Sequence, residues 1–251
     1  MSEAVAWPLG LALVGAIVGS FLATLVIRWP QERSVMRGRS VCDGCRRQLT
    51  ASELVPLVSS LVLRGRCRAC GAAIDPRHWQ VELGCAVIGA LAGSAVAEPA
   101  ALAGAAFGWL LLTLAALDAA ELWLPDPLVL ALALVGLASG LVGVPPVLVD
   151  RLIGGAAGFV VLWLVGFGYR RLRGREGLGG GDPKLFGAIG VMLGWQLLPA
   201  VLLLASATGL ALLLLGLARG RDVARDDALP FGSFLAMAAY PAWLLMIAWR
   251  T

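Results

Sequence analysis

Eight apolar runs of membrane-spanning character restrict the fold of this sequence more than any other feature. They cover residues 5–27, 81–97, 100–117, 128–142, 152–169, 185–199, 200–218 and 231–249. Several are shorter than the roughly 20 residues that usually cross the hydrocarbon core, which fits a compact bundle with partly buried helices. Charged residues make up 14% of the chain, against roughly 25% in soluble domains. The sequence therefore predicts an all-α polytopic membrane protein with about eight transmembrane helices.

The cationic residues give these runs an orientation. Eighteen of the 20 lysines and arginines lie after or beside the first, third, fifth and seventh runs, including Arg37 near the start and Arg219, Arg221 and Arg225 near the end. Only Arg151 and Arg250 fall on the other side. Because cytoplasmic loops carry the excess of lysine and arginine, these four loops are expected in the cytoplasm. The charges occupy discrete loops between apolar runs, so the lipid bilayer is an expected partner and nucleic acid is not.

The only sizeable polar segment, residues 29–80, contains two matched cysteine pairs. They are Cys42-x-x-Cys45 and Cys67-x-x-Cys70. Four thiolates at such spacing suit tetrahedral zinc, and a closed four-cysteine site is structural. A redox motif, disulfides or an iron–sulfur cluster are the competing interpretations, and cytosolic placement argues against disulfides. The segment is predicted to be a small cytoplasmic zinc domain, with Gly44 and Gly71 allowing its tight turns.

A carboxylate stands where the sixth apolar run is about to begin. Asp182 follows three consecutive glycines, Gly179, Gly180 and Gly181. A carboxylate at the edge of hydrocarbon is costly and is a functional candidate by default. Glycines remove side-chain bulk, so another backbone can approach closely. Lys184 either extends to the membrane interface or biases the charge of Asp182, and both interpretations stay open.

Asp118 is the expected partner of Asp182. It ends the third apolar run, and the predicted topology places both aspartates at the cytoplasmic membrane face. Two neighbouring carboxylates cannot both ionise easily, so they tend to share one proton and can perform general acid–base hydrolysis. Asp126, followed by Pro127, is interpreted as a helix N-cap, and Glu121 as a solvated interfacial residue.

These motifs together resemble the type IV prepilin peptidase family, the bifunctional leader peptidase/N-methyltransferases of the GxGD aspartyl class. The matching segments include Asp118 with Leu124-Pro125-Asp126, the run Gly179-Gly180-Gly181-Asp182 with Lys184-Leu185, and Leu229-Pro230-Phe231-Gly232. The resemblance implies three parts: a first transmembrane helix (1–28), the zinc domain (29–80) and a seven-helix aspartyl peptidase core (81–251).

The resemblance also implies an activity in the bacterial inner membrane. Asp118 and Asp182 would cleave the basic leader of type IV prepilins or pseudopilins after a glycine, on the cytoplasmic face. S-adenosylmethionine would then methylate the new N-terminus. Ala23 replaces an asparagine common in the family, within the part associated with methylation. Glu82 matches a family glutamate that serves either methylation, as a candidate cofactor-binding residue, or the orientation of the zinc domain.

Two hypotheses from other classes remain beside the peptidase. One is a proton- or cation-coupled transporter that uses the aspartate pair, with the zinc domain as a gate, because intramembrane acids often mark such pathways. The other is a non-catalytic membrane scaffold with a zinc-bound docking domain.

Overall fold

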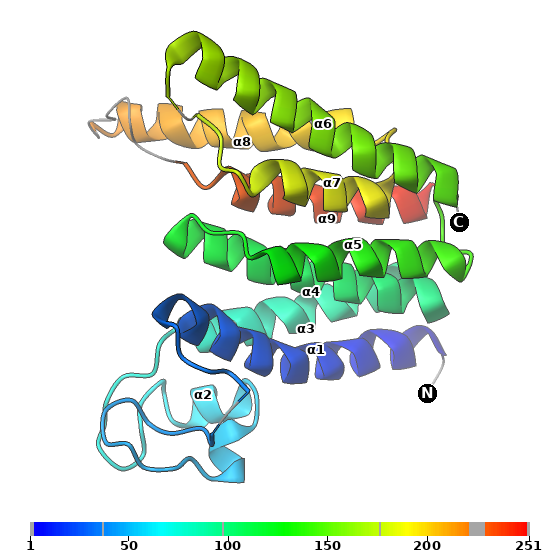
Figure 1. Cartoon of the computed structure of the whole chain (residues 1–251). Helices are drawn as coiled ribbons and strands as arrows, with labels where there is room; N and C mark the ends of the chain where they lie inside the picture. The colour runs from blue at the N-terminus through cyan, green and yellow to red at the C-terminus, as the bar shows by residue number, and fades with distance from the viewer. Residues whose placement is uncertain (1–2, 37, 97, 176, 221–228, 250–251) are drawn as a thin grey trace. The chain divides into compact units, whose positions relative to one another are not determined.

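The computed structural model of this chain describes residues 3–36, 38–96, 98–175, 177–220 and 229–249, and its regular elements there are helices. Two isolated β-bridges are the only strand-like pairings among these residues. The chain divides into two compact units, Met1–Ser94 and Ala95–Thr251 (Figure 1). Of the cationic residues named above, Arg37, Arg221, Arg225 and Arg250 lie outside the described ranges.

The first unit joins two long helices through an irregular segment. Its elements are α1 (Glu3–Arg28), η1 (Trp29–Gln31), η2 (Ala51–Leu54), α2 (Val58–Val62) and α3 (Arg77–Ala95). Helices α1 and α3 approach backbone to backbone, because a Cβ atom at Gly15 would collide with the carbonyl of Cys85 and one at Gly89 with that of Leu11. Such small-residue contacts are the usual way for helices to pack closely in lipid.

The second unit is a bundle of six helices in its described residues. They are α4 (Glu98–Glu121), α5 (Asp126–Leu141), α6 (Leu148–Arg173), α7 (Asp182–Leu193), α8 (Leu198–Ala218) and α9 (Phe231–Ala248). Prolines 127, 183 and 199 stand in the first turns of α5, α7 and α8, where a missing backbone N–H costs little.

Helix α7 is the centre of this bundle. It contacts α5, α6, α8 and α9, and ten of its 12 residues are buried (Figure 1). It packs most extensively on α6, where Gly154 and Gly190 each leave room for the other's backbone carbonyl. At about 18 Å its length falls short of the roughly 30 Å hydrocarbon core. Helix α7 is therefore a short helix enclosed by longer ones.

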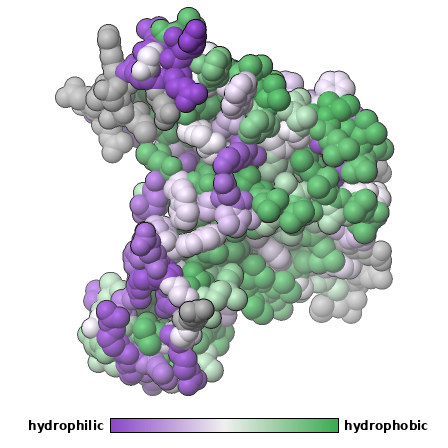
Figure 2. All heavy atoms as spheres, viewed as in Figure 1, coloured by the Kyte–Doolittle hydropathy of each residue, from purple (hydrophilic) through white to green (hydrophobic). Residues whose placement is uncertain are grey.

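Five helices within the described ranges are long and apolar enough to cross a membrane: α1, α4, α6, α8 and α9. Helices α4 and α9 are mostly buried, whereas α6 and α8 expose most of their apolar side chains. Figure 2 shows hydrophobic residues covering the helices and hydrophilic residues gathering over the segment after α1. A polytopic membrane protein is thus confirmed, and the count of eight spans stays a prediction.

Each of the eight predicted runs contains a helix, but one boundary was wrong. The run predicted over residues 185–199 ends as a helix at Leu193, because Gly194 leaves helical geometry with a φ of +77°. Pro199 lies in the first turn of α8 and does not end α7. A proline suits the first turn of a helix, where its missing backbone N–H costs little.

Arg151 on α6 is fully buried and links four segments of the second unit. Its guanidinium donates to six backbone carbonyl oxygens, at 2.7–3.2 Å, of Gly136, Val144, Pro145, Pro146, Val191 and Met192. These carbonyls belong to α5, the α5–α6 connection and α7. Arg151 was counted from the sequence as a loop charge, and in the structure it fastens α5 and α7 to α6.

Candidate active site

Asp118 lies in the last turn of α4 and is buried, with 5% of its surface exposed. Its Oδ2 atom accepts two hydrogen bonds from Ser233 near the start of α9, one from the backbone N–H at 2.6 Å and one from the hydroxyl at 3.1 Å. Glu121, three residues later, is exposed, as predicted. The last turn of α4 thus carries one buried acid, Asp118, and one exposed acid, Glu121.

Asp182 is the first residue of α7 and is also 5% exposed. Its Oδ2 accepts a hydrogen bond of 3.0 Å from the backbone N–H of Gly179. Its side chain makes no capping bond to the helix that it begins, because Gly179 precedes α7. Capping therefore does not account for this aspartate.

The fold brings the two aspartates together from positions 64 residues apart. Asp118, in the last turn of α4, and Asp182, at the start of α7, are both buried at one end of the second unit. Leu124, in the α4–α5 connection, fills the space beside Gly181 and Gly232. A Cβ atom at either glycine would lie 2.8 Å from its side chain. The end of α4 and the starts of α7 and α9 therefore meet around one pair of acids.

The three glycines before Asp182 have three different surroundings. A Cβ atom at Gly179 would lie 3.1 Å from Asp182 Oδ2, and one at Gly181 would press on Leu124. A Cβ atom at Gly180 would meet nothing within 4 Å. Gly179 and Gly181 are thus required by the fold of the loop, and Gly180 presents open backbone.

Lys184 forms an ion pair with Asp126, at 2.7 Å and 2.9 Å from its Nζ to the two carboxylate oxygens. The interpretation of Asp126 as an N-cap was therefore wrong. Pro125 occupies the cap position, and the carboxylate of Asp126 makes no capping bond. Lys184 instead connects the first turns of α5 and α7, which flank the aspartate pair.

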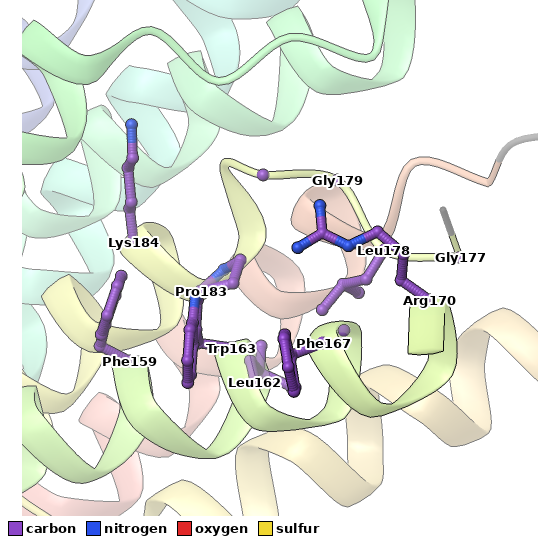
Figure 3. A pocket seen from close by; sticks show the side chains of 12 residues that line it. Phe159, Leu162, Trp163, Phe167, Arg170, Gly177, Leu178, Gly179, Pro183 and Lys184 are labelled. Atoms are coloured by element: carbon purple, nitrogen blue, oxygen red, sulfur yellow. The ribbon is translucent and has the colours of Figure 1, made fainter. Parts of the chain in front are cut away.

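A cavity of about 380 Å³ lies beside the glycine loop, between α6 and α7. Its apolar wall contains Phe159, Trp163 and Phe167 from α6, and the backbone at Gly179 and Gly180 forms another side (Figure 3). The rings of Trp163 and Phe167 stack with centroids 5.5 Å apart. The open backbone of the loop thus faces an aromatic cavity of ligand-binding size.

The four cysteines of the first unit form a single cluster. The sulfur atoms of Cys42, Cys45, Cys67 and Cys70 lie within 4.8 Å of one another, and Cys42 and Cys70 Sγ are 3.8 Å apart. A tetrahedral zinc with bonds of about 2.3 Å separates its sulfur ligands by about 3.8 Å. The donor set and its spacing therefore fit a structural zinc ion, which these four thiolates would hold. Cys85 is buried in α3 and lies outside the cluster.

The two cysteine pairs have the same backbone pattern. Cys42 N–H donates to the carbonyl of Arg47 and Cys67 N–H to that of Ala72, and each knuckle carries one β-bridge. The predicted turn role holds for Gly71, with a φ of +72°, but Arg46 and not Gly44 takes the matching conformation. Gly44 is instead needed for close packing, since a Cβ there would lie 2.8 Å from Ala72.

Glu82 on α3 is buried and holds the irregular segment of its own unit. Its Oε2 accepts a hydrogen bond of 2.8 Å from the backbone N–H of Leu57, whose φ of +61° is unusual for leucine. Of the two roles left open for Glu82, orientation of the zinc-binding segment has this direct contact in its support.

Comparison with known proteins follows this division of the chain. The profile of the bacterial peptidase A24 N-terminal domain matches residues 13–96, and that of the type IV leader peptidase family matches residues 105–214. A prepilin leader peptidase/N-methyltransferase of Aeromonas salmonicida is 41% identical over 212 residues, covering 84% of this chain and 72% of the relative.

The chain belongs to the type IV leader peptidase family. Relatives with the same name extend over still more of it. That of Burkholderia pseudomallei is 39% identical over 89% of this chain and 81% of its own length, and that of Dickeya chrysanthemi is 37% identical over 92% and 90%. No solved structure matches the chain significantly.

Sequence reasoning missed Ser233, which donates two hydrogen bonds to Asp118. A serine within an apolar run reads as a packing residue, and only its position directly after Leu229-Pro230-Phe231-Gly232 could have drawn attention to it. Its contact with Asp118 joins residues 115 positions apart, which no local pattern reveals.

Proposed function

We propose that this protein is a membrane aspartyl endopeptidase that removes the basic leader of type IV prepilins or pseudopilins. Cleavage would follow a glycine on the cytoplasmic face, with Asp118 and Asp182 as the catalytic pair. The observation that carries the proposal is the pair of buried carboxylates, on α4 and α7, beside Gly232 and Gly181, which both pack against Leu124. The family of the chain supports the substrate class.

The chemistry needs one proton on the pair. The ionised carboxylate takes a proton from water while the resulting hydroxide adds to the scissile carbonyl carbon. The protonated carboxyl group donates its proton to the carbonyl oxygen, which forms a neutral tetrahedral diol. As this diol collapses, one of its hydroxyl protons returns to the second acid, and the first acid passes the proton that it took from water to the leaving amine. Water and amide thus become acid and amine, with both aspartates restored.

The loop before Asp182 supports the approach of a substrate in this proposal. Gly180 presents backbone without a side chain, and the aromatic cavity beside it can receive apolar groups next to the cleaved bond. An extended segment can therefore pass close to the acids. Lys184 and Asp126 would hold the first turns of α5 and α7 at the rim of this passage.

The four-cysteine cluster would bind a structural zinc in the segment that follows α1. A second activity would follow cleavage: methylation of the new N-terminal amine, with S-adenosylmethionine as methyl donor. Relatives named as leader peptidase/N-methyltransferases support it. Mass spectrometry of the processed product tests it directly, since a methyl group adds a fixed mass to the new N-terminus.

Replacement of the two acids tests the peptidase. Asp118→Asn and Asp182→Asn are each expected to abolish cleavage of a co-expressed prepilin while the protein still inserts into the membrane. Glu121→Gln is the matched control, because it removes an exposed carboxylate one turn from Asp118. Normal processing by both aspartate variants would refute the peptidase. A proton or cation flux in vesicles that depends on the acids, without cleavage, would favour the transporter.

A further inference from the structure

Ser233 gives Asp118 a partner that Asp182 lacks. Each carboxylate faces the N-terminus of a helix, Asp118 that of α9 and Asp182 that of α7, which favours its ionised form, although Asp118 also lies in the last turn of α4, whose dipole opposes this. Both also accept one backbone N–H, from Ser233 and from Gly179. The hydroxyl of Ser233, 3.1 Å from Asp118 Oδ2, is a side-chain donor that only Asp118 has.

The hydroxyl of Ser233 is buried and has two acceptors for its single proton. Its Oγ lies 2.9 Å from the carbonyl oxygen of Ala115 and 3.1 Å from Asp118 Oδ2. The proton can point to the carboxylate while Asp118 is ionised, and turn to Ala115 once Asp118 has been protonated. Neither state leaves the buried hydroxyl without an acceptor, so the serine can follow a proton transfer without an unsatisfied donor.

The hydrogen bonds to Asp118 in the described part of the chain all end on one oxygen, Oδ2. Ser233 therefore anchors Oδ2 and leaves Oδ1 free of these donors. Donors to a carboxylate favour its ionised form over the neutral acid. In a pair that shares one proton, the acid with fewer donors retains it.

We propose that Ser233 is a positioning residue that assigns different roles to the two acids. It holds Asp118 as the carboxylate that takes a proton from water, and Asp182 keeps the proton that is donated to the scissile carbonyl. This inference rests on the proposed peptidase. Ser233 acts through Asp118 and touches neither the water nor the substrate in this scheme.

Single-turnover cleavage of a peptide with a basic leader, a glycine and an apolar segment tests the assignment in the detergent-solubilised full chain. Ser233→Ala keeps the backbone N–H and loses only the hydroxyl, so the cleavage rate at saturation is expected to fall roughly tenfold to a hundredfold. The KM should stay within about twofold, because no substrate contact is lost. Ser233→Thr, which restores a hydroxyl, should recover most of the rate.

Ser139→Ala is the matched control, since Ser139 is another buried serine of the second unit, bonded to the carbonyl of Gly136. It should change the melting temperature without changing the cleavage rate. A Ser233→Ala enzyme with the wild-type rate, or one in which only KM rises, would overturn the inference. Failure of the wild-type chain to cleave, or activity in Asp118→Asn, would instead refute the underlying peptidase.

Discussion

Leu124 occupies the space that a side chain at Gly181 would need, since a Cβ atom there would lie 2.8 Å from Leu124 Cβ. The same leucine lies against Gly232, whose own Cβ would approach Asp118 Oδ2 to 3.0 Å. The connection after α4 therefore sets how closely the loop of Asp182 and the start of α9 can approach. A change of one methyl group at this point should move the acids relative to each other.

The glycine loop should respond very differently at two adjacent positions. Gly181→Ala forces Leu124 aside and should reduce prepilin cleavage by about 10- to 100-fold, since a displacement of about 1 Å can cost that much. Gly180→Ala places its methyl group in open space along the proposed substrate path, so it should raise KM while leaving kcat nearly unchanged. Cleavage rates of the two variants, with the double variant Gly181→Ala/Leu124→Ala as a rescue, provide the measurement. Equal loss in both single variants would contradict the packing argument.

The ion pair of Lys184 and Asp126 should contribute little to stability. Both side chains are well exposed, 47% and 68%, and exposed pairs are worth about 0–1 kcal/mol. Lys184→Met, Asp126→Asn and the double variant form a cycle that isolates the coupling. Thermal unfolding in detergent at low and high salt measures it. A coupling well above 1 kcal/mol would mean that the pair is less solvated than its exposure indicates.

The four cysteines should bind about one zinc ion per chain. Cys42→Ser and Cys67→Ser should each lose the metal and lower the unfolding temperature, because binding of a structural zinc adds to folding free energy. Cys85→Ala removes a buried cysteine outside the cluster and should keep its full metal content. Metal analysis of the purified variants is the measurement. Full zinc occupancy in Cys67→Ser would exclude this ligand set.

Two substitutions of Glu82 can separate a structural role of this residue from a chemical one. Glu82→Ala leaves the N–H of Leu57 without its acceptor and should destabilise the chain by about 1–3 kcal/mol. Glu82→Gln keeps a carbonyl oxygen that can accept the same bond, so its stability should be close to wild type. Product methylation is then measured for the Gln variant. Loss of methylation at unchanged stability would assign Glu82 a chemical role beyond the hydrogen bond.

Asp75 should make the stability of the chain depend on pH at its acid end. Hydrogen bonds from the Arg77 side chain lower the pKa of Asp75, against the opposing effect of its partial burial. A carboxyl group with a lowered folded-state pKa contributes stability above its unfolded pKa and loses it as the pH falls through the folded value. Asp75→Asn should melt lower than wild type at pH 7, and this gap should close toward pH 3. A constant gap across this range would rule out the ionised pair as its source.

The helices and the cysteine cluster were predicted well because both carry local signals. Apolar runs and paired cysteines are visible in short windows, and each was found where expected. Asp126 shows the limit of local signals, because it was predicted to be a helix cap and instead forms an ion pair. A carboxylate before a proline suits a cap, but its partner, Lys184, lies 58 positions away in the sequence.

The roles of Ser233 and Gly44 could not be predicted for the same reason: each depends on a contact with a residue that is distant in the sequence. Nothing around Ser233 in the chain indicates that its hydroxyl meets Asp118, because the contact depends on how α4 and α9 pack. Gly44 was expected to allow the tight turn of its knuckle. In the structure Arg46 takes the left-handed conformation of this turn, and Gly44 makes room for Ala72 of the other knuckle.

Arg151 was one of only two cations assigned to the outer side from the sequence, yet its guanidinium is sealed inside the second unit and donates to six carbonyl oxygens. It behaves as a non-covalent crosslink, which no solvent ion or lipid headgroup can reach. An insertion machinery that sorts loops by their exposed charge would meet this arginine only before the bundle closes. Arg151 can therefore influence membrane topology only during insertion. In the folded protein its charge holds α5, α6 and α7 together.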